Sequence, residues 1–111
     1  MAFKLGTLEH AKGYVVNKLF EQRRFGGKHL PVVYLRHGYP PNWRHMIKTA
    51  TEALRKEGIV RIERKRTGRD YADHAVLVWS KLGQARSLLN GYRAKEGLPR
   101  LGRDLKTFLP V

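Results

Sequence analysis

The sequence contains no cysteine, few acidic residues and no long hydrophobic run. Without cysteine the chain can form no disulfide, no thiolate zinc site and no cysteine nucleophile. The longest apolar runs, Pro31–Leu35 and Ala75–Trp79, are far shorter than the ~18 residues of a membrane-spanning helix. The first residues carry no long apolar block, so no secretory signal is expected. These absences predict a soluble intracellular protein with no membrane partner, and a length of 111 residues predicts one domain.

Acidic residues are scarce relative to basic ones. The chain has 23 Lys and Arg against 9 Asp and Glu, which is a formal net charge of +14. Self-repulsion on this scale destabilises a compact domain unless a polyanion neutralises it. DNA, RNA, an anionic membrane and an acidic protein could each do so, and a single-sign field of this size favours nucleic acid. We therefore expect nucleic acid as the partner.

Signals for catalysis and for metal binding are also missing. The chain has no paired acids placed for one pocket, no serine on a strand-to-helix elbow and no credible Ser–His–Asp arrangement. His29, His37 and His45 are evenly spaced, but no carboxylate lies at ligand spacing, so capping, packing or phosphate contact is their expected role. We expect no enzyme, no catalytic residue, no metal and no cofactor.

Apolar periodicity predicts a long helix followed by a short one in the first part of the chain. Apolar residues recur on one face of residues 8–24, Thr7 is a candidate N-cap, and Gly26–Gly27 would end the helix. Pro31 near the start and a glycine just past the end favour a short helix over residues 30–38. The apolar face of the first helix consists of Leu8, Ala11, Val15 and Leu19.

A second long helix is predicted after a rigid connector. Neither proline of Tyr39–Pro41 can continue a helix from the preceding residue. Asn42 is then a good N-cap for a helix over Trp43–Glu57, and Gly58 stands in the stop position. Its predicted core face consists of Trp43, Met46, Ile47, Ala50, Ala53 and Leu54. Four aromatic residues on apolar faces are expected in the core rather than as base-stacking platforms: Tyr14, Phe20, Trp43 and Trp79.

After the second long helix the apolar period changes from that of a helix to that of a strand. Residues 59–79 read as a β-hairpin whose tip, residues 64–70, is a basic loop with Gly68 as its turn residue. Ser80 is a candidate cap for a further helix that ends near residue 97. The apolar stripe of that helix consists of Leu82, Ala85, Leu88, Leu89 and Tyr92.

The element order resembles the winged helix-turn-helix superfamily, including the multiple-antibiotic-resistance type of regulator and many archaeal transcription factors. Ala53–Ile62, which reads ALRKEGIVRI, is similar to the end of a recognition helix running into the first wing strand. Val78–Arg86 is similar to the opening of the helix that follows the wing. The resemblance implies an α+β fold over residues 1–97, with a three-helix core, a β-hairpin wing and an additional C-terminal helix. Residues 98–111 would form an apolar tail docked on the domain or on a dimer partner.

Candidate binding residues lie on the second long helix, at its entrance and on the wing. Rotation at about 100° per residue places four of them in a stripe away from the apolar face, without an acid in the stripe itself. A helix carrying such a stripe fits a DNA major groove, and wings contact backbone phosphates or the minor groove. The stripe consists of Arg44, Lys48, Thr51 and Arg55, the entrance residues are Tyr39 and Asn42, and the wing residues are Arg64, Lys65, Arg66 and Arg69.

The function expected from charge and resemblance together is binding of double-stranded DNA. A charge of +14 favours a chromatin-like or broadly binding, transcription-associated role in the cytoplasm, at the nucleoid, over a tight sequence-specific switch. An RNA-binding or ribosomal protein with the same fold is the main alternative, and a module that docks on an acidic protein is a third. Analogy with winged-helix regulators suggests a homodimer through the C-terminal helix and tail. Two Gln, three Asn and no Cys fit a thermophile, in keeping with the archaeal likeness.

Overall fold

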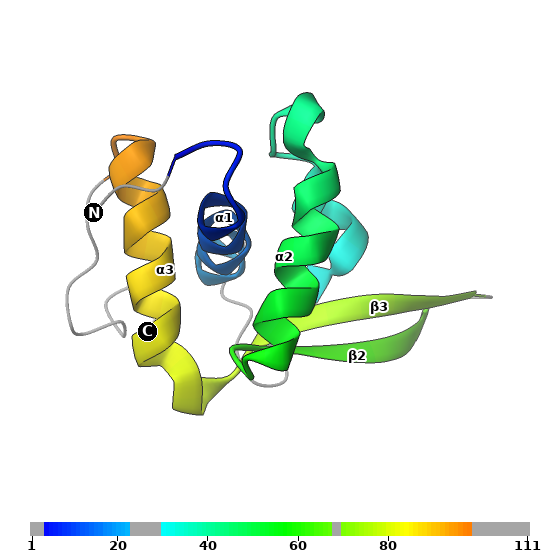
Figure 1. The fold of residues 1–111 in the computed structure, drawn as a ribbon. Coiled ribbons are helices and arrows are strands. Elements are labelled where there is room, and N and C mark those ends of the chain that lie inside the picture. The colour runs from blue at the N-terminus through cyan, green and yellow to red at the C-terminus, as the bar shows by residue number, and fades with distance from the viewer. Residues whose placement is uncertain (1–3, 23–29, 68–69, 99–111) are drawn as a thin grey trace.

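A computed structural model describes residues 4–22, 30–67 and 70–98, and these residues form an α+β fold. In chain order the elements are α1 (Leu8–Glu21), β1 (Leu30–Pro31), the 3₁₀ turns η1 (Val32–Arg36) and η2 (Pro41–Trp43), α2 (His45–Lys56), β2 (Val60–Thr67), β3 (Asp70–Leu77), the 3₁₀ turn η3 (Trp79–Lys81) and α3 (Leu82–Lys95). Figure 1 shows α1 between α2 and α3, with the β2–β3 hairpin projecting from the C-terminal end of α2. The predicted tail lies outside the described residues apart from Leu98. No helix in the described part of the chain has the length and apolar character needed to cross a lipid bilayer.

Helix α1 follows the sequence prediction closely. The Thr7 side chain accepts a hydrogen bond from the His10 backbone N–H at 3.2 Å, so the predicted N-cap is confirmed. The helix ends at Glu21, somewhat before the predicted end, and Gly26–Gly27 lie outside the described residues. On the predicted apolar face Ala11, Val15 and Leu19 are fully buried, and Leu8 is partly buried against the core.

The segment that enters α2 differs from the prediction. The short helix expected over residues 30–38 is a two-residue strand followed by the turn η1. The next turn, η2, begins with Pro41 and includes Asn42, so α2 begins only at His45. The residue at its N-cap is Arg44, without a side-chain cap, and the prediction that Asn42 caps α2 is wrong. Proline suits the first position of a helical turn because it has no N–H to satisfy, and here that turn is a separate 3₁₀ turn.

The three described strands form one antiparallel sheet in the order β1-β3-β2. The hairpin predicted over residues 59–79 is confirmed, but the loop predicted over residues 64–70 is wrong. Strand β2 continues to Thr67 and β3 begins at Asp70, so most of the basic segment is paired strand. Backbone ladder bonds do not depend on apolar side chains, so a strand can continue through residues such as Arg64 and Arg66 that lack an apolar alternation. Gly68, the predicted turn residue, lies outside the described residues.

Helix α3 ends as the sequence predicts but begins differently. Ser80 lies inside η3, and the N-cap residue of α3 is Lys81 without a side-chain cap, so the prediction of a serine cap is wrong. At the other end Gly97 has a φ of +70°, and the Leu98 N–H donates to the Arg93 carbonyl at 2.8 Å. On the predicted apolar stripe Ala85 and Leu89 are buried, and Leu82, Leu88 and Tyr92 are partly buried against the core.

The hydrophobic core lies where α1 packs against α2, α3 and the sheet. Tyr14 and Phe20 are buried as predicted, whereas the side chain of Trp79 is outside what the structure describes. The prediction that Trp43 is buried is wrong, because it is 36% exposed. Trp43 ends η2 and so lies outside the helical register from which its burial was predicted. Its ring packs instead against Gly6, ahead of α1.

A buried polar network joins α1 to α3 and to the turn before α2. Tyr39 is only 2% exposed, so the prediction that it contacts nucleic acid is wrong. Its hydroxyl is hydrogen bonded to His10 Nδ1 at 2.6 Å, and His10 Nε2 lies 3.1 Å from Glu96 Oε1. A neutral imidazole can donate to the carboxylate and accept from the phenol, which satisfies both ring nitrogens. The neighbouring Tyr14 hydroxyl accepts from the Gly38 N–H at 3.2 Å. Hydrogen bonds of His10 and Tyr14 therefore attach this turn to α1.

Substitution of Gly13 tests the close approach of α1 and α3. A Cβ atom at Gly13 would lie 2.6 Å from the Leu88 carbonyl oxygen and 2.7 Å from the Tyr92 Cβ. Gly13→Ala is therefore expected to lower the free energy of unfolding by about 1–3 kcal/mol in urea titrations, because the helices must separate. Gly83→Ala is the control, since nothing lies within 4 Å of a Cβ there. The control should raise stability by about 0.5–1 kcal/mol, and equal effects of the two changes would contradict this packing.

The buried tyrosines predict a loss of stability at alkaline pH. Burial raises the pKa of Tyr39 and of Tyr92 to about 12, and the Glu96 carboxylate adds to both shifts. Unfolded tyrosine releases its proton near its ordinary pKa of about 10, so above that pH the unfolded state binds fewer protons than the folded state. The free energy of unfolding should fall from about pH 10 to about pH 12, by at most ~1.4 kcal/mol per pH unit for each tyrosine. Urea titrations across this range measure it, and Tyr39→Phe should have a shallower dependence than the unaltered chain.

Candidate functional site

The outward face of α2 carries fewer of the predicted residues than the helical wheel suggests. Lys48 is exposed on this face, whereas Thr51 is only 5% exposed, so its place in the exposed stripe is wrong. The Thr51 hydroxyl donates to the Ile47 carbonyl at 2.7 Å, one turn earlier on the buried side. Thr51 lies at the edge of the apolar face, and η1 and the hairpin cover that edge. Asn42 is exposed in η2, ahead of the helix.

An acid beside the stripe pairs with one of its cations. The Arg55 Nε atom donates to Glu52 Oε1 at 2.9 Å, and a second guanidinium nitrogen contacts the same oxygen. This hydrogen bond holds the pKa of Glu52 below its ordinary value and raises that of Arg55. Both side chains are exposed, so the pair is a weak surface interaction that a phosphate can displace.

Arg44 is held by the turn that precedes α2. Its Nε atom donates to the Tyr39 carbonyl at 3.0 Å, and its Nη2 atom donates to the His37 carbonyl at 3.4 Å. These bonds orient the guanidinium at the start of the helix while the residue stays exposed. Arg44 is therefore a positioned cation rather than a freely moving one, because two backbone carbonyls restrict its rotamers.

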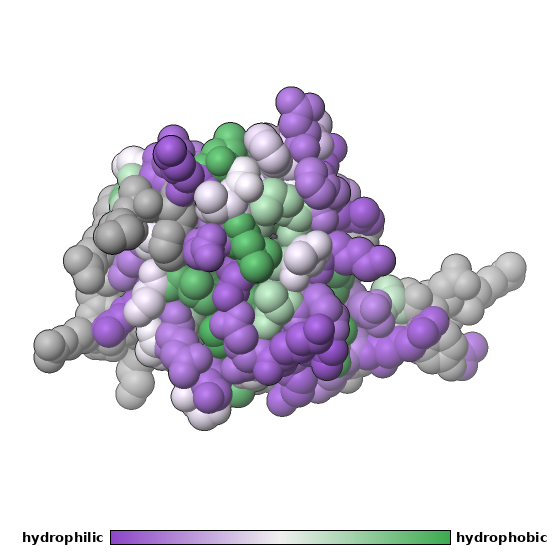
Figure 2. All heavy atoms as spheres, in the orientation of Figure 1, coloured by the Kyte–Doolittle hydropathy of each residue, from purple (hydrophilic) through white to green (hydrophobic). Residues whose placement is uncertain are grey.

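The hairpin continues the charged surface beyond α2. Arg64 and Arg66 are exposed on β2, on the same face of the strand as Ile62, because side chains two residues apart share a face. Arg64 is paired in register with Asp73 of β3. The side chain of Lys65 and all of Arg69, both predicted to contact nucleic acid, lie outside what the structure describes. Figure 2 shows hydrophilic side chains at the two ends of α2 and at the base of the hairpin, with paler ones over the middle of the helix.

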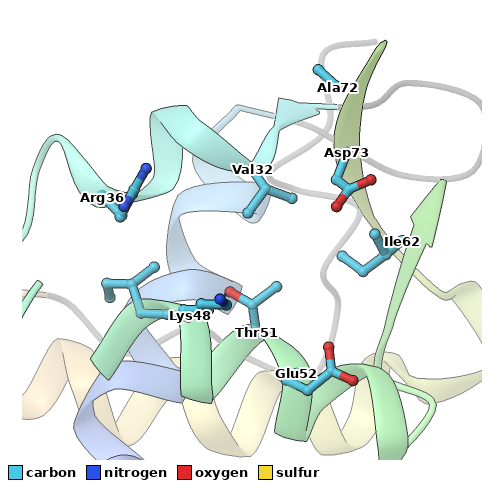
Figure 3. A pocket seen from close by; sticks show the side chains of 9 residues that line it. Val32, Arg36, Lys48, Thr51, Glu52, Ile62, Ala72 and Asp73 are labelled. Atoms are coloured by element: carbon cyan, nitrogen blue, oxygen red, sulfur yellow. The ribbon is translucent and has the colours of Figure 1, made fainter. Parts of the chain in front are cut away.

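Two of the hollows that adjoin α2 contain predicted binding residues together with residues of the neighbouring turns. The first, which we call the mixed hollow, lies between η1, α2 and the hairpin and has a volume of about 410 Å³. Figure 3 shows Arg36 and Lys48 toward one end and Glu52 and Asp73 toward the other. Its remaining lining residues are Val32, Ile47, Thr51, Ile62 and Ala72. Both signs of charge lie around an apolar floor, so this hollow does not by itself select an anion.

The second hollow, which we call the basic hollow, is lined by residues of one sign of charge. It has a volume of about 550 Å³ and lies where the end of η1 meets the start of α2. Three always-charged cations and two histidines line it, without a carboxylate: Arg36, His37, Arg44, His45 and Lys48. The sequence predicts Arg44 and Lys48 as binding residues, and gives phosphate contact as one possible role of His37 and His45. Arg36 and the two histidines line the basic hollow because the turns η1 and η2 fold the segment before α2 against the helix.

No metal centre is found within residues 4–22, 30–67 and 70–98. These residues contain no group of three or more His, Asp or Glu side chains placed to hold a metal ion. His37 and His45 line one hollow, but the other lining groups are cations, which repel a metal ion. The hollow is therefore suited to an anion. The third evenly spaced histidine, His29, lies outside the described residues.

The chain matches no protein-family model, no curated protein and no solved structure. Its function is therefore inferred from the residues around α2 and the hairpin.

Proposed function

We propose that this chain is a winged-helix protein that binds double-stranded DNA, with α2 in the major groove and the hairpin along the backbone. The element order supports this proposal, since a three-helix arrangement with a projecting antiparallel hairpin is compatible with a helix-turn-helix and a wing. The short strand β1 pairs with the inner hairpin strand β3 and ties the base of the hairpin to the helices.

The observation that carries the proposal is a row of exposed cations from the start of α2 to the hairpin, with the acids Glu52 and Asp73 on its hairpin side. Lys48 stands at its centre because it lines both the mixed hollow and the basic hollow, together with Arg36. Arg44 lies at the helix start, and Arg64 and Arg66 extend the row along β2. Phosphate oxygens are spaced along both strands of a duplex, so a row of cations can contact several of them at once.

The dimensions of the two elements suit a duplex. The major groove is about 12 Å wide and admits one α-helix. Each hairpin strand has eight residues, which at about 3.3 Å per residue extends roughly 26 Å. With α2 in the groove, the hairpin is long enough to reach the flanking backbone. Glu52 on α2 has the chemistry to accept from a cytosine amino group, so the acid beside the stripe is compatible with this placement.

The large net charge favours broad over narrow specificity. Phosphate neutralisation supplies most of the affinity in non-specific binding. A formal charge of +14 increases this electrostatic, sequence-independent part of the affinity. We therefore propose a chromatin-like or transcription-associated role. An RNA-binding protein with the same fold is the alternative outcome of the first test below.

The first test is a competition assay with labelled random-sequence duplex DNA. Unlabelled duplex should displace the label at a lower concentration than a single strand or an RNA hairpin of equal length. The logarithm of the binding constant should fall linearly with the logarithm of the salt concentration, by about 0.9 per phosphate neutralised. Stronger displacement by the RNA hairpin would replace the DNA proposal with the RNA one, and no displacement by any nucleic acid would reject both.

The second test removes the charges that line both hollows. Lys48→Gln combined with Arg36→Gln is expected to raise the Kd for duplex DNA about tenfold and to reduce the salt slope by about 1–2. The control is Lys95→Gln combined with Arg86→Gln, which removes one lysine and one arginine from α3. Fluorescence anisotropy at fixed salt measures both variants. If the control weakens binding as much as the test variant, the row of cations beside α2 is not the binding surface.

A further inference from the structure

The basic hollow brings five positively charged or titratable side chains to one place without an acid among them. Arg36 and Lys48 stand between it and the mixed hollow, where the acids Glu52 and Asp73 lie. Arg44 is already oriented by its two carbonyl hydrogen bonds. Such a concave cluster of donors is suited to a tetrahedral anion, because several cations can approach different oxygens of one phosphate.

The two histidines distinguish this hollow from an ordinary basic patch. His37 follows η1, and His45 is the first residue of α2; both are exposed. The groups around His37 are the edge of the Tyr34 ring, with centroids 5.7 Å apart, and Arg36 and Arg44. His45 lies beside the Trp43 ring, with centroids 6.4 Å apart, and faces the hollow with Arg44 and Lys48.

Protonation of these two side chains would couple to occupancy of the hollow. Histidine is the side chain that ordinarily changes charge between about pH 5 and pH 8. A neutral imidazole adds no charge to the hollow, whereas a protonated one adds a cation and a second N–H donor. A bound phosphate favours the protonated form because the charges are opposite, so the occupied hollow holds more protons than the empty one. By linkage, the affinity for phosphate then increases as the pH falls.

We infer that the basic hollow is a proton-linked phosphate site, in which Arg36, Arg44 and Lys48 bind the anion and His37 and His45 make its affinity depend on pH. The phosphate is a phosphodiester of the nucleic-acid backbone, and in this respect the inference rests on the proposed function. Inorganic pyrophosphate offers the same oxygens without a nucleic acid and serves as an independent probe of the hollow.

The decisive experiment compares the Kd for random-sequence duplex DNA at about pH 6 and about pH 8, at one salt concentration. Backbone phosphodiesters do not titrate in this range, so a pH dependence arises from the protein. The unaltered chain is expected to bind about fivefold to tenfold more tightly at the lower pH. His37→Gln combined with His45→Gln should bind with less than about a twofold difference. The Lys95→Gln and Arg86→Gln control should keep the full dependence.

A second measurement separates failure of this inference from failure of DNA binding. Pyrophosphate is added to the unaltered chain at about pH 6, and the imidazole resonances are followed by NMR. Those of His37 and His45 should shift, while that of the buried His10 should not. If duplex DNA does not bind but pyrophosphate shifts both resonances, the hollow is still a phosphate site, and the proposal that its ligand is nucleic acid is rejected. The inference is overturned if neither resonance shifts, or if the double histidine variant keeps the pH dependence.

Discussion

Burial of α1 against both α2 and α3 is the constraint on which the rest of the structure depends. Its fully buried residues include Ala11, Val15 and Leu19, and Gly13 lets α3 approach closely on one side. The same helix holds the turn before α2 through hydrogen bonds that Tyr14 and His10 accept from the Gly38 N–H and the Tyr39 hydroxyl. Because that turn sets where η2 ends and α2 begins, the packing of α1 also determines which side of α2 remains exposed.

The surface around α2 that this packing leaves exposed contains two hollows that differ in the charge of their lining residues. The basic hollow at the start of α2 holds one sign of charge, whereas the mixed hollow beside the hairpin pairs cations with Glu52 and Asp73. An exposed ion pair such as Arg55–Glu52 contributes little to stability, so these charges are available for binding at small cost to the fold. A polyanion would compensate the self-repulsion of the cations, which the isolated domain cannot do internally with 9 acids against 23 basic residues.

The structure corrects several members of the binding surface predicted from the sequence. Lys48 and Arg44 line the basic hollow as expected of exposed cations, but Tyr39 and Thr51 are buried. The Tyr39 error arises ahead of α2, where two prolines suggested a simple connector and the chain instead forms a 3₁₀ turn. Thr51 lies within α2 at the edge of its apolar face, where its hydroxyl donates to the Ile47 carbonyl. A helical wheel that begins at Trp43 places this residue on the apolar face of the helix, although the α-helix begins only at His45. For Tyr39, a tyrosine just before a helix is compatible both with a phosphate contact and with a place in the core.

The sequence by itself determined the α+β class, the order of the three long helices and the hairpin, the Thr7 cap and the apolar faces of α1 and α3. These follow from local periodicity and capping chemistry, which neighbouring residues carry without reference to distant ones. Only the tertiary structure decided that the buried Tyr39 pairs with His10, whose other ring nitrogen meets the exposed Glu96, and that Arg36, His37 and His45 share a hollow with Lys48. Those contacts join side chains from separate turns and helices, so they depend on how the elements pack, which no local pattern in the chain encodes.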